Sequence, residues 1–169
     1  MSRPVLLDYC SGAGGAAMGY HHAGFDVVGV DVVPQPRFPF RFIRADITTL
    51  GLAELVAFTG AVALHGSPPC QRASRLRHYQ PATIDDKYAD LIPGMRADFA
   101  ASGLPYVIEN VPQAELLNPV ELCGAMFDLP MYRHRHFETN WQLQAPVHPP
   151  HIARCTRNGY LPTPEAPAR

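Results

Sequence analysis

The sequence predicts one α/β domain built on a Rossmann-like, doubly wound and mostly parallel sheet. Short apolar runs alternate with helix-compatible stretches through the first 110 residues, a glycine loop follows the first run, and acidic residues follow later runs. An alternation of strands and helices is typical of a parallel sheet with helices on its faces. A length of 169 residues suits a single domain of this kind.

The expected elements follow in order along the chain. Residues 4–9 form an apolar run that predicts a buried strand, and a helix-compatible stretch at 16–24 is expected to end at Gly24. Residues 26–30 predict a second strand, closed by Asp31, and three prolines predict a loop at 32–42. The remaining expectations are a strand at 43–47, a helix at 49–58, a strand at 61–65, a loop at 71–86, a helix at 87–102, a strand at 104–110 and a final strand at 135–143.

Two regions differ in composition. Residues 1–145 are expected to form the catalytic domain, and the Pro- and His-rich residues 146–169 an irregular tail. No apolar run approaches the roughly 20 residues of a membrane helix, and the start of the chain lacks the features of a secretory signal. The four cysteines form no C-x-x-C pair, so free thiols and a cytoplasmic location are predicted.

Charge gives a weaker indication of function. The net charge of -1 does not by itself indicate a nucleic-acid-binding protein. Two short basic clusters, at residues 72–78 and 133–136, stand beside the motifs described next. A cluster of this size is usually a solvated surface, and only its position beside a site gives it weight.

Glycines and acids follow the first three predicted strands. Residues 8–15 read DYCSGAGG, and glycines at this point let the backbone approach a ligand closely. Asp31, after the second strand, is placed to accept hydrogen bonds from ribose hydroxyls, and Asp46, after the third, to meet an adenine amino group. Together they predict an adenosine-containing cofactor. A dinucleotide is the alternative, but the G-x-G-G spacing lacks the third glycine of the G-x-G-x-x-G fingerprint.

A cysteine follows the strand at 61–65 in the segment GSPPCQ. Two prolines stiffen the backbone just before Cys70, and three nearby arginines, at 72, 75 and 77, favour its thiolate. Glu109 lies at the end of the next strand, where an acid is costly without a partner or a task. A thiol and a carboxylic acid at the cofactor edge predict covalent catalysis, whereas a buried structural cysteine is the alternative.

These motifs, in their order, resemble the DNA (cytosine-5) methyltransferases. The segments that carry the resemblance are DYCSGAGG, GVD, ADI, GSPPCQ, YVIENVP and RHRHFE, spread over residues 4–141. The stretch ELCGAMFDLPMYRHRHFETN is similar to small phage or actinobacterial members. The resemblance implies a methyltransferase fold that binds S-adenosylmethionine and is abbreviated at its C-terminus.

The resemblance also implies roles for individual residues. Cys70 would attack carbon 6 of cytosine, Glu109 would contact ring nitrogen N3, and Arg135, with Arg133 nearby, would hold the base. Family members usually flip the target base out of the duplex. The implied cofactor-binding residues are Asp8, Cys10, Gly12, Gly14, Asp31, Asp46, Ile47 and Pro69, and the implied DNA-contacting loop residues are Gln71, Arg72, Ser74 and Arg75.

The chain departs from the family pattern at several positions, including Val32, Ala73 and Met131, and at its C-terminal end. Cys10 stands where the family usually has a Phe that packs on the adenine, and few residues follow Trp141, where the family continues into a target-recognition region. A second chain or a homodimer partner is therefore expected to complete the cofactor pocket and base recognition. A free cytosine nucleotide as substrate, transfer of a modified methyl group, or a binding protein without turnover are the alternatives to methylation of DNA.

The Pro- and His-rich tail contains a partial metal-ligand pattern. His148, His151 and Cys155 have the spacing H-x-x-H-x-x-x-C, which resembles part of a zinc set. The sequence shows no obvious fourth ligand, so a plain irregular tail is predicted and no metal ligand is assigned.

Overall fold

The computed structural model describes residues 2–71, 73, 89–152 and 159–160. Seven strands form one sheet in the order β3-β2-β1-β4-β5-β7-β6. The first five strands in this order are parallel, and β7 pairs antiparallel with both β5 and β6. The strands are β1 Val5–Tyr9, β2 Asp26–Asp31, β3 Arg41–Arg44, β4 Ala61–Gly66, β5 Tyr106–Asn110, β6 Val120–Cys123 and β7 His134–Thr139. The predicted doubly wound, mostly parallel sheet is confirmed.

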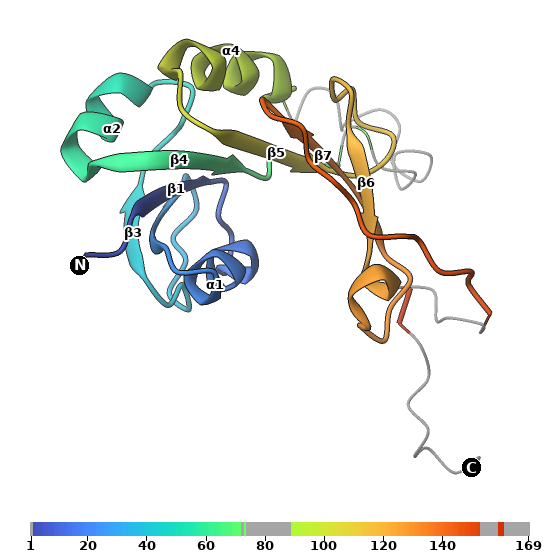
Figure 1. Ribbon diagram of the computed structural model, residues 1–169. Helices are drawn as coiled ribbons and strands as arrows, with labels where there is room; N and C mark the ends of the chain where they lie inside the picture. The colour runs from blue at the N-terminus through green and yellow to red at the C-terminus, as the bar shows by residue number, and fades with distance from the viewer. Residues whose placement is uncertain (1, 72, 74–88, 153–158, 161–169) are drawn as a thin grey trace.

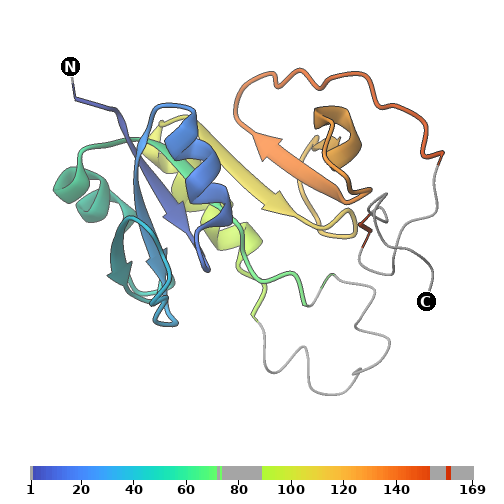
Figure 2. The same cartoon turned by 90° about the horizontal axis from the view of Figure 1, so that it is seen from below.

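Helices cover both faces of the sheet. The helix α1 (Gly15–His22) lies on one face, and α2 (Leu52–Thr59) and α4 (Ile92–Ser102) lie on the other (Figures 1 and 2). A short 3-10 helix, η2 (Gly124–Phe127), follows β6. Among the described helices, none is long and apolar enough to cross a membrane.

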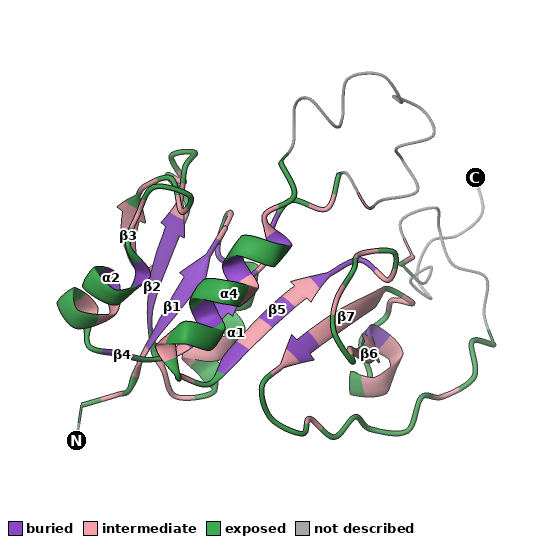
Figure 3. Cartoon of the chain, turned by 90° about the horizontal axis from the view of Figure 1, so that it is seen from above, coloured by how far each residue is buried: buried purple, intermediate pink, exposed green. Residues whose placement is uncertain are grey.

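The core divides between the two faces because side chains alternate along each strand. On the side of α2 and α4, Leu7 of β1 belongs to the larger cluster with Leu55 and Phe99. On the side of α1, Leu6 belongs to a smaller cluster with Ala17. The central strands β1, β2 and β4 are largely buried, whereas β7 is mostly half-buried (Figure 3).

Several boundaries differ from the sequence prediction. The strand expected at 43–47 is β3 at Arg41–Arg44, because Asp46 instead closes a turn that delays α2 to Leu52. The helix expected from residue 87 begins at Ile92, where the Asp90 carboxylate accepts the Ile92 N–H. Pro93 then suits the first helical turn, since its missing N–H would have no helical partner there.

The region after β5 differs more. Sequence reasoning missed β6, a four-residue strand, and expected the last strand at 135–143. The strand β7 ends at Thr139 because the Asn140 side chain accepts from Tyr106 N and donates to Leu104 O. Residues 142–152 form neither helix nor strand.

Candidate active site

The predicted site residues follow parallel strands that end at one edge of the sheet. The register places Tyr9 beside Val30 of β2 and Gly66 of β4, and Gly66 beside Ile108 of β5. The strand order reverses between β1 and β4, so the loops after these strands diverge there. Ligands of doubly wound sheets bind at such a switch point.

The glycine loop between β1 and α1 has a backbone that favours glycine. Gly12 and Gly14 have φ angles of 49° and 92°, in the left-handed region that is costly for other residues. A Cβ added to Gly14 would lie 2.8 Å from Pro39 Cδ and 3.0 Å from the Phe38 ring. The residues that precede β3 therefore pack directly against this loop.

Two aspartates fix the surroundings of the loop. The Asp31 carboxylate accepts the N–H groups of Gly12 at 3.0 Å and Val33 at 2.9 Å, which ties the loop to the end of β2. The Asp46 carboxylate accepts from the hydroxyl of Thr48 at 2.7 Å and from its N–H at 2.9 Å. These hydrogen bonds, the hydroxyl first, lower the pKa of Asp46, so this exposed carboxylate stays ionised.

Cys10 shows that these carboxylates gather around the loop. Burial first, and then the negative charges of Asp31, Asp8 and Asp46 in that order, raise the pKa of the Cys10 thiol to about 12. The thiol is therefore neutral at physiological pH. Cys10 also adopts a positive φ of 56°, which is uncommon for a residue with a side chain.

A buried pair of Asp8 and His65 lies behind the loop, and sequence reasoning missed the histidine. His65 Nδ1 donates to Asp8 Oδ1 at 2.7 Å, and both side chains are almost fully buried. His65 Nε2 lies 3.5 Å from Ser67 Oγ. The signal was present in the sequence, because each is a polar residue inside an apolar strand and such groups need partners.

The loop that carries Cys70 is anchored just before the cysteine. Ser67 N donates to Tyr9 O at 3.0 Å, and the buried Asn110 side chain donates to Pro68 O at 3.0 Å. Cys70 is half-buried, and its carbonyl accepts the N–H of Ala73 in a turn. Asn110 directly follows Glu109, so the cysteine loop is attached to the end of the strand that bears the acid.

Glu109 forms an ion pair with Arg135. Arg135 Nε lies 2.7 Å from Glu109 Oε1, and about a fifth of each side chain is exposed. Both residues border a cavity of about 740 Å³. Its lining comes from α1, the end of β4, β5 and β7: Gly15, Ala16, Gly19, Tyr20, Ala23, His65, Ser67, Glu109, Arg133, Arg135 and Phe137. The predicted Glu109, Arg133 and Arg135 are thus brought together.

Other predicted residues do not line this cavity. Pro69 lines a cavity of about 150 Å³ beside Asn110, and Ile47 lines one of about 350 Å³ beside Tyr9 and Asp98. Gln71 is exposed. The predicted loop residues Arg72, Ser74 and Arg75 lie outside the described residues.

Comparisons with known proteins identify the fold. No protein-family model matches the sequence, and no curated protein matches it significantly. A methyltransferase of Entamoeba histolytica, EhMeth, is similar in structure, with a TM-score of 0.62, 14% identity and coverage of 88% of this chain. A mutant of DNMT2 from Spodoptera frugiperda has a TM-score of 0.54, with 18% identity over 94% of this chain. The chain has a methyltransferase fold.

The methyltransferase fold is present here in a short chain. This chain covers 58% of EhMeth and 57% of the DNMT2 mutant, which is less than two thirds of either. A hypothetical protein of Thermus thermophilus, with a TM-score of 0.51 and 17% identity, is similar over 81% of this chain and 74% of its own. At these identities the likeness establishes the fold alone.

Proposed function

We propose that the chain transfers a methyl group from S-adenosylmethionine to carbon 5 of cytosine in DNA, with Cys70 as the nucleophile. The observation that carries this proposal is the Glu109–Arg135 ion pair at a cavity edge, attached through Asn110 to the loop of Cys70. A thiol, an acid and an arginine are the groups that addition to a pyrimidine ring requires. One structural neighbour is DNMT2 of Spodoptera frugiperda, whose name is consistent with this chemistry.

The loop after β1 fits a polar, adenosine-containing cofactor. Among the described residues, Asp8 Oδ2 and Ser11 Oγ are buried without a hydrogen-bond partner. Buried polar atoms normally have partners, so two such atoms at a glycine loop fit a bound polar group. Asp31 keeps unused lone pairs for hydroxyl groups, since each oxygen accepts one backbone N–H. When bound, S-adenosylmethionine supplies the electrophilic methyl group.

The protein's residues would activate the cytosine base in the following steps. The Cys70 thiolate adds its electron pair to carbon 6, and Glu109 protonates or hydrogen-bonds N3, so that carbon 5 becomes nucleophilic. Arg135 holds Glu109 and the base in place. After carbon 5 gains the methyl group, loss of its proton to a base re-forms the double bond and expels the Cys70 thiolate.

A mechanism-based trap tests the proposal. In 5-fluorocytosine, fluorine replaces the hydrogen at carbon 5 that must leave as a proton. The last step is therefore blocked, and the enzyme and the methylated base remain covalently joined. We expect a DNA-linked protein band with wild-type protein and cofactor. It should be absent in Cys70→Ser and retained in Cys155→Ser, a matched cysteine change. The attachment site is read by peptide mass spectrometry.

Assays with several substrates in parallel distinguish the proposal from its alternatives. Tritium transfer from labelled cofactor is measured into duplex DNA, single-stranded DNA and deoxycytidine nucleotides. Label in nucleotides alone would replace DNA by a free nucleotide as the substrate. Cofactor binding without label in any substrate would favour a binding protein, and addition of candidate partner chains then tests the expected second subunit.

A further inference from the structure

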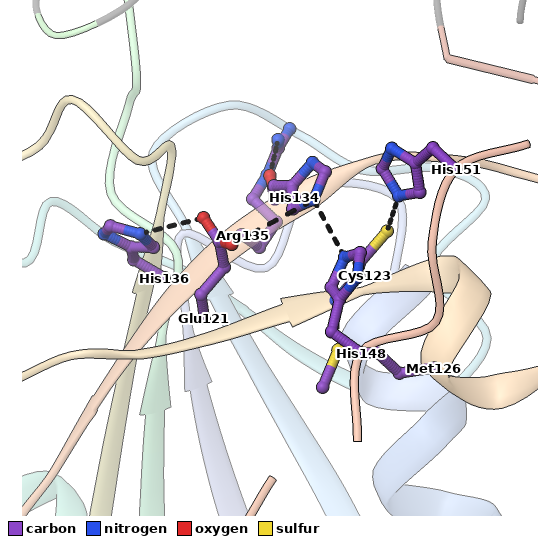
Figure 4. A network of polar contacts seen from close by, with 8 residues as sticks. All are labelled: Glu121, Cys123, Met126, His134, Arg135, His136, His148 and His151. Atoms are coloured by element: carbon purple, nitrogen blue, oxygen red, sulfur yellow. Dashed lines mark hydrogen bonds and ion pairs between the residues drawn. The ribbon is translucent and has the colours of Figure 1, made fainter. Parts of the chain in front are cut away.

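Four possible metal ligands converge beside the hairpin of β6 and β7. Cys123 ends β6, His134 begins β7, and His148 and His151 come from the irregular segment that follows β7. Their ligand atoms all lie within 4.8 Å of one another. Figure 4 shows the three imidazoles and the thiol directed toward a common point.

Two distances within the cluster are close to those around a tetrahedral zinc ion. Cys123 Sγ lies 3.4 Å from His151 Nε2, and His134 Nε2 lies 3.1 Å from His148 Nε2. With Zn–N bonds of about 2.0–2.1 Å and a Zn–S bond of about 2.3 Å, tetrahedral geometry separates two nitrogens by about 3.3 Å and sulfur from nitrogen by about 3.6 Å.

The hairpin and the segment after β7 are arranged to hold this cluster. Cys123 and His134 are direct cross-strand partners, and Cys123 is buried. The ring of His151 stacks on Tyr132 with centroids 3.8 Å apart, and the ring of His148 stacks on His134 at 5.3 Å. His148 and His151 are both exposed and come from a segment without helix or strand, so a bound metal would supply the energy that holds them there.

We propose that Cys123, His134, His148 and His151 bind one structural Zn²⁺. One thiolate and three imidazoles suit zinc, and four protein ligands leave no open position for a substrate. The H-x-x-H-x-x-x-C pattern contains neither Cys123 nor His134, which lie earlier in the chain on the β6–β7 hairpin, and Cys155 lies outside the described residues. The proposal does not depend on the proposed methyl transfer.

The site would also stiffen the strand that carries the arginine of the active site. Side chains alternate along β7, so His134 faces the metal cluster while its neighbour Arg135 reaches Glu109. Zinc would fasten the segment around His148 to this strand. Loss of the metal is therefore expected to loosen the Arg135 position without removing a group that contacts substrate.

Metal content measured on protein without a histidine tag tests the site. We expect one zinc ion per wild-type chain by mass spectrometry. His148→Ala and His151→Ala should lower zinc retention at least about tenfold, because each removes one of four ligands. His136→Ala is the matched control, since His136 lies on the same strand, pairs with Glu121 and is outside the cluster. Because His148 and His151 are exposed, neither substitution removes a side chain from the folded core.

Cobalt substitution and chelation give readouts independent of enzyme activity. Co²⁺ should produce the visible bands of a tetrahedral ion and a thiolate charge-transfer band, and Cys123→Ser should lose the charge-transfer band and bind the metal more weakly. A chelator should lower the melting temperature of wild-type protein and not that of His148→Ala. Zinc-free protein that takes up neither Zn²⁺ nor Co²⁺ would overturn the proposal, and so would a preference for copper with an intense blue colour.

Discussion

The imidazole of His65 and the carboxylate of Asp8 meet inside the sheet, where few charged groups are tolerated. Because the carboxylate accepts from Nδ1, it fixes the orientation of the ring and directs Nε2 toward Ser67 and the large cavity. The ring of Tyr20 lies 5.2 Å from that of His65, on the α1 side. The pair therefore couples the interior of β1 to the wall of the proposed active site.

Replacement of Asp8 by Asn tests the energetic weight of this pair. Asp8→Asn keeps the shape of the side chain but weakens a buried hydrogen bond to a charged acceptor. We expect the free energy of unfolding to fall by about 1–3 kcal/mol in urea denaturation. Asp26→Asn is the control, because Asp26 is largely exposed and its 3.9 Å contact with Arg3 should contribute less than about 1 kcal/mol. Equal effects of both changes would contradict this interpretation.

The pKa of Cys10 predicts its reactivity. With a pKa raised to about 12, Cys10 holds almost no thiolate at pH 8 and should resist alkylation by iodoacetamide, with labelling that increases only as the pH rises toward that value. Asp31→Asn removes the largest of the negative charges that raise the pKa, so the pKa should fall and labelling at a given pH should increase. Peptide mass spectrometry after timed alkylation measures both effects. Rapid labelling of wild-type Cys10 at pH 8 would refute the prediction.

Among the elements, α4 and β7 are joined by a nearly buried ion pair. Arg96 Nε donates to Glu138 Oε1 at 2.6 Å, and its second nitrogen donates to Oε2 at 2.8 Å. Glu138 Oε2 also accepts Leu117 N at 2.8 Å. One carboxylate thus holds a helix, a strand and the connection before β6 in place.

We expect removal of Arg96 alone to lower the stability of the folded protein. Arg96→Met leaves the Glu138 carboxylate buried without its charged partner, and such losses reach about 3–5 kcal/mol. The lower part of that range applies because 20% of the Arg96 side chain is exposed. The double variant Arg96→Met with Glu138→Gln should recover part of the loss, as measured by urea denaturation. A double variant less stable than the single one would show that the charge was not the cause.

Sequence patterns predicted the elements that have strong local signals. The apolar runs of β1, β2, β4 and β5 were found because buried parallel strands are continuously apolar. The start of α4 and the position of β3 were missed, since side-chain turns at Asp90 and Asp46 set these boundaries. The strand β6 is short and gains its place by pairing with β7, which no local pattern reveals.

Across the whole molecule, the two faces of the sheet are covered unequally. The face of α2 and α4 carries the larger core, whereas α1 leaves a cavity of about 500 Å³ along β4 and β5 that reaches Trp141. Of the predicted site residues, Glu109, Arg133 and Arg135 border one cavity, and Asp31 and Asp46 lie close to the glycine loop. Contacts between residues distant in sequence, as in His65 with Asp8 or Cys123 with His151, depend on the tertiary fold and could not be predicted from spacing.

The amide of Asn110 offers a way to inactivate the proposed methyl transfer. Its Nδ2 donates to Pro68, and its Oδ1 accepts from Val111 at 2.8 Å, so one neutral side chain sets the separation of the thiol loop from the acid. A replacement there would shift the two reactive groups apart while leaving both intact. A chain that retains every proposed reactive group can therefore still be inactive, and the presence of those groups alone does not establish turnover.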